Sequence, residues 1–423
     1  MDEYFSALEK YNFWENNPSQ LGFLRTAYTD KITGYTGNRL VKVLVGQRRA
    51  GKSYLLRQLV LKLIESGVPS RNIFFLNREM ADFDFIKTYK DLDTLFKLYK
   101  EKIKPVGRIY LFIDEIQNIE GWEQIVNSYS QDYTADYELF ISGSNSKMLS
   151  GELATLLSGR YVSFEIFPLS YREFLGITEQ MQSKESYLDF LQTGGLPELY
   201  QLTQEDVKRN YVSALKDTVL LRDIIQRHAI KDTRLLEDIF VYLVNNASNL
   251  FSIKNIVNYF KSSGRKTTYD TVSAYLNYIE QSYLIHKAER YDIKGKEIIG
   301  GVSKYYINDL SFYNYLYRGF AYGIGYLLEN LIYLELRKAE YHVFVGNFKS
   351  REVDFVAIKG ERTIYIQCSY ILYDKLTVER EYASLQQIDD NYEKIVVSLD
   401  DINLPSNAGI KHIQAWNFYE FIK

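Results

Sequence analysis

The chain has 423 residues, of which 46% are apolar and 25% are charged, and its formal net charge is −3 at pH 7. This length exceeds what one hydrophobic core usually serves, so we expect two to four domains. The composition is that of a globular protein and excludes an intrinsically disordered chain. The slightly negative charge excludes nucleic-acid binding through overall charge, so any such binding requires a local basic patch.

The cysteine content and the termini indicate the compartment. A single cysteine, Cys368, excludes an intrachain disulfide framework and a cysteine-rich zinc site. Residues 1–17 are acidic and lack the charged-then-apolar order of a signal peptide. The longest apolar helical run, residues 319–336, is interrupted by Glu329 and Glu335 and is too polar for a membrane span. We therefore expect a cytoplasmic protein with no membrane segment.

A strand, a glycine-rich loop and a helix follow one another near the N-terminus. The apolar run 40–45 predicts a buried strand, and apolar residues at helical spacing over 55–63 predict a helix. Between them lies GQRRAGKS, which matches the G-x-x-x-x-G-K-S pattern of a phosphate-binding loop in its required context. Backbone N–H groups of such a loop, and the helix N-terminus, face the phosphates. The predicted nucleotide-binding residues are Gly46, Gln47, Arg48, Arg49, Ala50, Gly51, Lys52, Ser53 and Tyr54.

Four side chains receive specific roles in this site. Lys52 is expected to reach the β and γ phosphates of ATP, and the Ser53 hydroxyl is placed to bind Mg²⁺. A second apolar run, 109–113, ends in Asp114 and Glu115. We expect Asp114 to hold Mg²⁺ and Glu115 to orient and polarise the attacking water. The sequence thus predicts an ATP-hydrolysing site that uses Mg²⁺.

Three further apolar runs predict strands, at residues 72–77, 137–144 and 161–166. Their alternation with helical segments predicts an α/β fold, a parallel sheet with helices on both faces. Ligands of such sheets lie at the carboxyl ends of the strands. That rule places Asn145, with Ser142 and Ser144, near the γ-phosphate as a sensor. The alternative is a turn satisfied by the Ser and Asn side chains.

Five segments together carry a family resemblance: GQRRAGKS, FIDEIQNIEGW, ISGSNSKMLSGELATLLSGR, FPLSYREFL and GGLPELY. Their order and spacing resemble a prokaryotic group of AAA+-type ATPases, the archaeal-type AAA_14 P-loop ATPases that carry a C-terminal DUF4143 domain. The resemblance covers nearly the whole chain and implies an ASCE-type P-loop ATPase with Glu115 as the catalytic acid. It also implies that Arg160 is an arginine finger, in cis or across the subunit boundary of a homo-oligomer. The residues alone equally allow a surface charge or a strand-end ion pair at Arg160.

The middle of the chain has the layout of a winged helix-turn-helix. A turn at 194–199 is followed by helical sequence from about residue 203 to residue 245. Next come a helix, the turn SSGRK, a second helix capped by Thr267 or Thr268, and two strands around DIKGK.

This segment also carries local positive charge, because residues 252–307 contain nine Lys or Arg and five Asp or Glu. The candidate DNA-backbone contacts lie on the turn and on the wing: Arg265, Lys266, Lys294 and Lys296. Tyr269 and Ser273 are the side chains expected to face a major groove. A second interpretation stays open, in which the winged helix serves packing or binds a protein partner.

The last hundred residues alternate helix, strands, helix and strand. This unit resembles the restriction-endonuclease-like PD-(D/E)XK fold, in which acids on the first helix and on a hairpin bind Mg²⁺ and a lysine assists. Glu329 and Asp354 match two of the acids, whereas Gln367 stands where the second hairpin acid belongs. Ser369 stands in the lysine position, and Lys359 or Lys375 is sterically able to substitute. A neutral amide weakens cation binding and a hydroxyl supplies no positive charge, so we expect a degenerate site.

We therefore predict three domains: a P-loop ATPase at 1–200, a helical and winged-helix domain at 201–318, and a DUF4143-like domain at 319–423. The predicted function is Mg²⁺-dependent ATP hydrolysis that repositions the appended domains on DNA or on a protein partner. Two alternatives are a slow regulatory switch, which signals its ATP or ADP state to protein partners, and an ATP-coupled DNA endonuclease.

Overall fold

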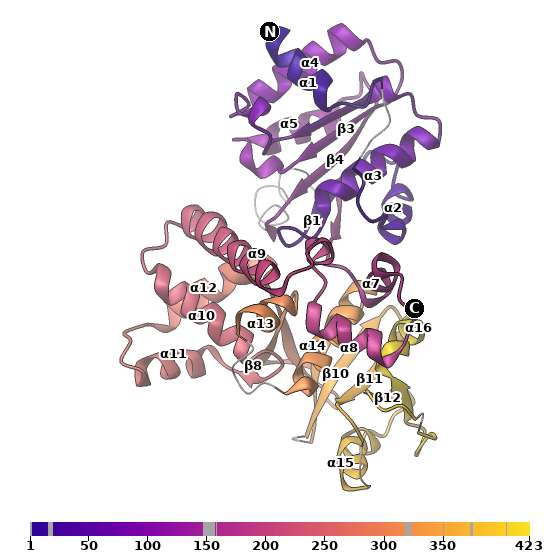
Figure 1. Cartoon of the computed structure of the whole chain (residues 1–423), viewed down its shortest axis with the longest axis vertical. Helices are drawn as coiled ribbons and strands as arrows, with labels where there is room; N and C mark the ends of the chain where they lie inside the picture. Colours follow the sequence, from indigo (N-terminus) through magenta and orange to yellow (C-terminus); the bar gives the residue numbers. More distant parts are fainter. Residues whose placement is uncertain are drawn as a thin grey trace. The chain divides into compact units, whose positions relative to one another are not determined.

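The computed structural model describes residues 2–15, 20–146, 157, 159–317, 323–349, 351–372, 375–402 and 404–423. The chain divides into two compact units, Met1–Ile166 and Phe167–Lys423 (Figure 1). Each unit is built on one sheet. In the described part of the chain, no helix has the length and apolar character needed to cross a membrane.

The first unit contains α1 (Asp2–Tyr11), α2 (Thr26–Thr33), β1 (Val41–Val45), α3 (Lys52–Glu65), η1 (Ser70–Asn72), β2 (Ile73–Asn77), η2 (Ala81–Phe83), α4 (Tyr89–Ile103), β3 (Ile109–Asp114), η3 (Ile116–Asn118), α5 (Trp122–Gln131), β4 (Tyr137–Gly143) and β5 (Tyr161–Glu165). All five strands are parallel, in the order β2-β3-β4-β1-β5. Helices α4 and α5 cover one face and α2 and α3 the other (Figure 1), as right-handed crossovers require. The predicted α/β P-loop fold is therefore confirmed.

Burial explains why these segments form central strands. Every residue of β1 and β4 is buried, because helices cover both faces of the sheet. β4 lies between β1 and β3. The carboxyl ends of three strands, which carry the phosphate loop, the Asp114–Glu115 pair and Asn145, are therefore neighbours.

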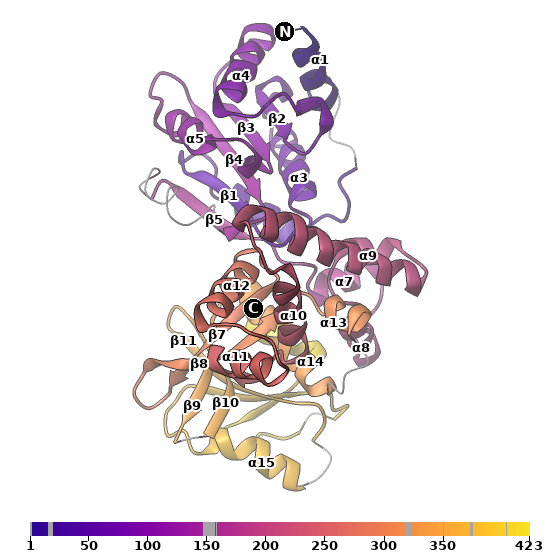
Figure 2. The ribbon, with the colours of Figure 1, turned by 90° about the vertical axis from the view of Figure 1, so that its left-hand side faces the viewer.

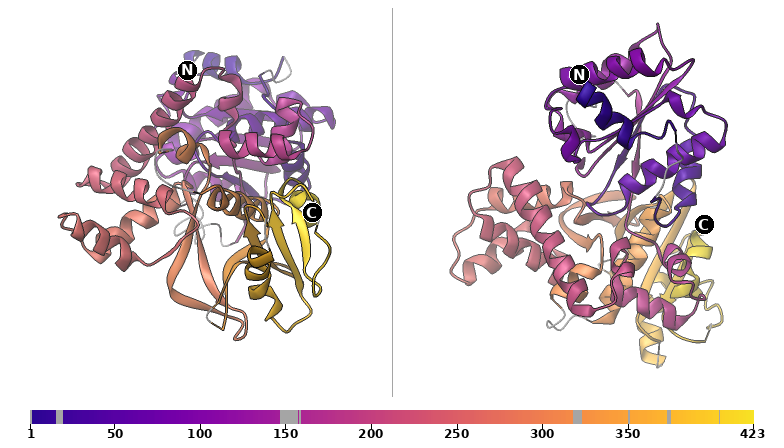
Figure 3. Two further views of the ribbon diagram at one scale, coloured as in Figure 1. Left: turned by 60° about the horizontal axis from the view of Figure 1, so that its bottom comes forward. Right: turned by 45° about the horizontal axis from the view of Figure 1, so that its top comes forward.

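The second unit contains α7 (Tyr171–Thr178), α8 (Lys184–Thr193), η5 (Pro197–Gln201), α9 (Glu205–Asp217), η6 (Thr218–Gln226), α10 (Thr233–Asn245), β6 (Leu250–Phe251), α11 (Ile253–Ser262), α12 (Tyr269–Gln281), β7 (Ile285–Asp292), β8 (Glu297–Ile307), α13 (Ser311–Leu316), α14 (Ile324–Lys338), β9 (His342–Phe348), β10 (Arg351–Lys359), β11 (Arg362–Ser369), α15 (Lys375–Gln386), β12 (Glu393–Ser398), β13 (Lys411–Gln414), η7 (Ala415–Asn417) and α16 (Phe418–Ile422). Its eight strands form one mixed sheet, β13-β12-β11-β10-β9-β7-β8-β6. The orange and yellow strands of this sheet are seen from other sides in Figures 2 and 3.

The predicted boundary at 318/319 does not separate two domains. β7 pairs in parallel with β9, over Arg290–Asp292 and Val345–Asn347, so the predicted wing and the predicted C-terminal domain share a sheet. The predicted boundary at 200/201 also differs from the division into two compact units, because side chains of α7 and α8 belong to the apolar core of the second unit. Local strand and helix patterns do not report which distant segments pair, so the sequence could not show that these segments share one sheet.

Candidate functional site

The loop between β1 and α3 depends on its glycines. Gly46, Arg49 and Gly51 have φ values of 144°, 66° and 93°. At Gly46 a Cβ would lie 2.2 Å from the carbonyl oxygen of Ile166, which leaves no room for a side chain. Gly51 is the left-handed N-cap of α3, so the loop runs directly onto the positive end of the helix dipole.

Lys52 is held inside this loop. Its Nζ donates hydrogen bonds to the carbonyl oxygens of Gly46, at 2.9 Å, and Gln47, at 3.0 Å. The side chain is only 4% exposed, and burial lowers the pKa of Lys52, whereas the nearby Glu115 and Asp114 carboxylates raise it. An ammonium group beneath a loop of backbone N–H groups is suited to bind phosphate.

Asp114 ends β3 at the centre of the site. Its carboxylate accepts hydrogen bonds from the Ser142 hydroxyl and from Asn77 Nδ2, the latter at 3.0 Å, and it is also hydrogen-bonded by Ser53. Burial, followed by the neighbouring Glu115 carboxylate, raises the pKa of Asp114 to about 6. A bound divalent cation would stabilise the ionised Asp114 carboxylate, because its positive charge offsets the buried negative charge. The Ser53–Asp114 contact therefore fits Mg²⁺, with these two oxygens as its protein ligands.

Glu115 follows Asp114 at the carboxyl end of β3 and is held there by hydrogen bonds. Its backbone is left-handed, with φ of 54°, and its N–H donates to Ser142 Oγ at 3.2 Å. The carboxylate accepts hydrogen bonds from the Gln117 side chain and from Ser144 Oγ, the latter at 3.5 Å. Asn145 is buried two residues after the end of β4. Glu115 and the residues that follow β4 thus lie at the same carboxyl end of the sheet as Asp114.

Arg160 lies at the opposite edge of the sheet. It is exposed immediately before β5, and its carbonyl accepts the N–H of Val41 at the start of β1. The phosphate loop follows the other end of β1, about 16 Å away at roughly 3.3 Å per residue. Arg160 therefore lies at the end of β1 that is far from its own phosphate loop. Residues 147–156 and 158, which precede it in the predicted motif, lie outside the described residues.

Three contacts around the site were absent from the sequence prediction. Arg25 is buried and donates from Nη1 to the carbonyl of Ala50 at 3.0 Å, in the phosphate loop. Asn77 donates a hydrogen bond to the Asp114 carboxylate, and Gln117 donates one to the Glu115 carboxylate. The strand-end rule could have identified Asn77, since it ends β2, whereas nothing in the sequence links Arg25 to the loop. Arg48, in the same loop, forms an ion pair with Glu79 at 2.6 Å.

The C-terminal acids meet, but around an unexpected partner. Lys304 Nζ, from β8, lies 2.7 Å from Glu329 Oε1 and 3.4 Å from Asp354 Oδ1. Gln367 instead donates from Nε2 to Glu381 on α15, at 3.2 Å. Lys359 is exposed and lies over the Tyr341 ring, so it does not substitute in this site. The Lys375 side chain lies outside the described residues.

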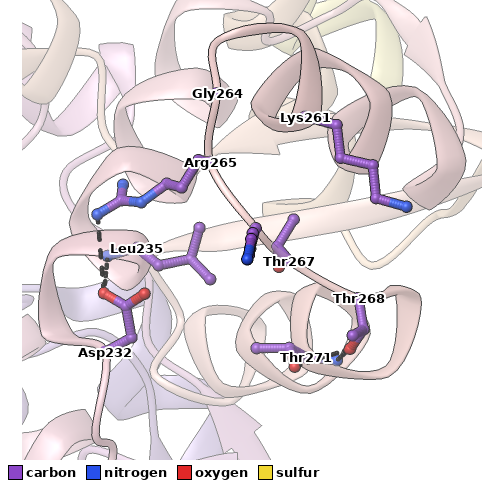
Figure 4. Close-up of a pocket in the computed structure, with 9 residues that line it drawn as sticks. Asp232, Leu235, Lys261, Gly264, Arg265, Thr267, Thr268 and Thr271 are labelled. Atoms are coloured by element: carbon purple, nitrogen blue, oxygen red, sulfur yellow. Dashed lines mark hydrogen bonds and ion pairs between the residues drawn. The ribbon is translucent and has the colours of Figure 1, made fainter.

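The basic residues predicted to contact DNA differ in their exposure and in the acids that lie beside them. Arg265 is paired with Asp238 and lies 3.7 Å from Asp232 (Figure 4), so its charge is already compensated. A contact between Arg265 and a DNA phosphate would therefore compete with these two acids, at the N-cap and on the first turns of α10. Lys266 is exposed next to it, and Thr268, not Thr267, caps α12 by accepting the N–H of Thr271. Figure 4 shows both threonines lining the pocket beside Arg265.

Lys294 and Lys296 are exposed in the turn between β7 and β8. The turn itself is anchored, since Ile293 is buried and its N–H donates to the carbonyl of Asn347. Helix α12 contains Asp270 and Glu280 and no Lys or Arg. Positive charge therefore lies beside α12 and not on it.

Comparison with known proteins identifies the first unit. A family model described as an AAA domain matches residues 38–175, which includes the phosphate loop, Asp114 and Glu115. An uncharacterized protein of Haemophilus influenzae is 35% identical over 379 residues, which cover 88% of this chain and 92% of the relative. The protein MJ1544 of Methanocaldococcus jannaschii is 32% identical, over 86% of this chain and 81% of the relative. The chain belongs to the family of these AAA-domain proteins. It is an ATP-binding ATPase of the AAA+ type.

A second model, for a domain of unknown function called DUF8612, matches residues 184–322 of this AAA+ chain. The match corrects the predicted DUF4143 designation. Among solved structures, the Walker-type ATPase PABY2304 of Pyrococcus abyssi aligns with a TM-score of 0.44 and 15% identity, over 70% of this chain and 95% of that one.

Proposed function

We propose that the chain hydrolyses ATP with Mg²⁺ in the cytoplasm. The observation that carries this proposal is the convergence of Lys52, Ser53, Asp114 and Glu115 at one sheet edge. Lys52 and the loop N–H groups hold the phosphates, and Ser53 with Asp114 holds the metal. Bound Mg²⁺ offsets charge that develops on the phosphate oxygens. Glu115, oriented by Gln117 and Ser144, positions and polarises the attacking water.

Asn145, beside these carboxylates, senses the γ-phosphate. Arg160 acts as the arginine finger of a neighbouring copy in a homo-oligomer, a role supported by its exposed position at the end of β1 far from its own phosphate loop. The route proposed for the signal is Ile166, whose N–H donates to the carbonyl of Val45 directly before the phosphate loop and whose next residue begins the second unit. ATP and ADP states then reposition the second unit on DNA or on a protein partner. In the alternative function, the protein signals its ATP or ADP state to a partner and the rate of hydrolysis does not matter. The same contacts then serve a slow regulatory switch.

The element order α10, β6, α11, α12, β7, β8, with β6 pairing β8, supports a winged helix in the second unit. Exposed Lys266, Lys294 and Lys296 support contact with a phosphate backbone, whereas the acids on α12 favour a protein partner for that helix. A degenerate nuclease-like role for residues 319–423 rests on Glu329 and Asp354.

Phosphate release by the purified chain tests the hydrolysis proposal. Wild type should release phosphate with ATP and Mg²⁺, and Lys52→Ala should bind ATP about 100-fold more weakly and release none. The matched control is Lys62→Ala, since Lys62 lies on the same helix and its carboxylate partner is the exposed Asp30. Equal rates in wild type and Lys52→Ala would overturn the proposal.

Asn77→Ala should raise the Mg²⁺ concentration that gives half-maximal hydrolysis by about tenfold. The reason is that Asp114 loses the amide that orients Oδ2 at 3.0 Å. Because Asn77 is a positioning residue, the ATP concentration for half-maximal rate at saturating Mg²⁺ should change little. An unchanged Mg²⁺ dependence would remove Asn77 from the metal site.

A further inference from the structure

Four charged side chains of the second unit form one cluster. Lys304 Nζ lies 2.7 Å from Glu329 Oε1, 2.7 Å from Glu352 Oε1 and 3.4 Å from Asp354 Oδ1. The Lys304 side chain is 3% exposed, and Glu329 and Asp354 are also buried. The side chains come from β8, α14 and β10, and helix α14 packs against both strands. An ammonium group therefore occupies the point on which three carboxylates converge.

The oxygens of this cluster already have partners. Glu329 Oε1 also accepts the Tyr306 hydroxyl at 2.8 Å, and Asp354 Oδ2 accepts the N–H of Cys368 at 2.8 Å. The surrounding carboxylates hold the pKa of Lys304 well above its usual value despite burial, so the group stays protonated. A permanently protonated lysine cannot serve as a general base.

We propose that this cluster is a cation site whose cation is the ammonium group of Lys304, and that Lys304 excludes divalent metal from it. Mg²⁺ requires oxygens at about 2.0–2.1 Å and Mn²⁺ a similarly short contact, so neither ion fits beside an ammonium group at this centre. The acids are thus satisfied without metal. Among the described residues, no three His, Cys, Asp or Glu side chains are arranged to hold a metal ion. Removal of the ammonium leaves three carboxylates without a positive charge between them, and carboxylate oxygens are ligands that a hard divalent cation prefers.

The ammonium also has a structural role. Lys304 comes from the β7–β8 hairpin, Glu329 from α14, and Glu352 with Asp354 from β10. Removing one partner of a buried ion pair is strongly destabilising, because the remaining charges are left uncompensated. The cluster therefore fastens the hairpin to the rest of the second unit.

Thermal unfolding of the full chain tests the proposal, in an Asp114→Asn background that disables the nucleotide metal site. Mn²⁺ without nucleotide should leave the Tm of this background chain unchanged. Adding Lys304→Ala should lower the Tm by about 10 °C in EDTA, and Mn²⁺ should restore much of the loss. Adding Asp354→Asn to Lys304→Ala should abolish the recovery. A Lys304→Ala chain that does not respond to Mn²⁺, or a background chain that binds Mn²⁺ in an Asp354-dependent way, would overturn the proposal.

Amine labelling of the folded wild-type chain decides the question if the variant does not fold. Acetylation followed by mass spectrometry should modify the exposed Lys294 and Lys296 and spare Lys304, with or without Mn²⁺. Labelling of Lys304 that appears only with Mn²⁺ would mean that metal displaces the ammonium, which contradicts the proposal. Mn²⁺-dependent DNA cleavage that is lost in Lys304→Ala would contradict it equally.

Discussion

Glu115→Gln is expected to bind ATP with nearly wild-type affinity and to release phosphate about 100-fold more slowly or worse. The amide keeps the size of the side chain and can still accept the Gln117 hydrogen bond, so the site should keep its geometry. It carries no negative charge, however, and cannot polarise the attacking water. ATP titration and single-turnover phosphate release measure the two effects separately.

The matched control is Glu120→Gln, an exposed acid that follows η3. It should hydrolyse ATP at the wild-type rate. If Glu115→Gln also kept that rate, Glu115 would lose its assigned role even though it lies beside Asp114. A variant that lost ATP binding as well would indicate a structural contribution from the carboxylate.

Gly46→Ala should destabilise the first unit by about 3 kcal/mol or more and abolish ATP binding. Its Cβ would lie 2.2 Å from the Ile166 carbonyl oxygen and 3.1 Å from the carbonyl carbon. The strand cannot move away freely, because the N–H of Ile166 donates to the carbonyl of Val45 at 2.7 Å. Chemical denaturation followed by tryptophan fluorescence measures the loss, since Trp14 and Trp122 lie in this unit.

Gly67→Ala separates steric collision from backbone strain. Gly67 has φ of 98°, but nothing lies within 4 Å of the position that its Cβ would take. The substitution should therefore cost only the left-handed strain, about 1–2 kcal/mol, and ATP binding should persist. Equal losses in the two variants would show that contact with Ile166 is unimportant.

The sequence was sufficient to predict those functional residues that lie close together in the chain. The loop 46–53 and the Asp114–Glu115 pair are contiguous motifs, and each stands directly after a strand whose apolar run is visible. The predicted strands at 72–77 and 137–144 differ from β2 and β4 by one residue at one end. Burial on both faces of a parallel sheet produces such runs, so local pattern and fold agree there.

In the second unit, the sequence was insufficient to predict which charged side chains lie close together. Lys304 lies 25 positions before Glu329 and 50 before Asp354, and the three side chains meet only in the folded second unit, where β8 and β10 belong to one sheet and α14 packs against both. Arg265 looked available for DNA until the fold placed Asp232 and Asp238 beside it.

The sequence by itself determined the nucleotide chemistry, because that chemistry requires fixed residue types at fixed spacing. The tertiary structure alone decided which charges compensate one another and which edge of the sheet Arg160 occupies. The physical reason is that strand pairing and ion pairing depend on contacts between distant segments, about which local periodicity carries no information.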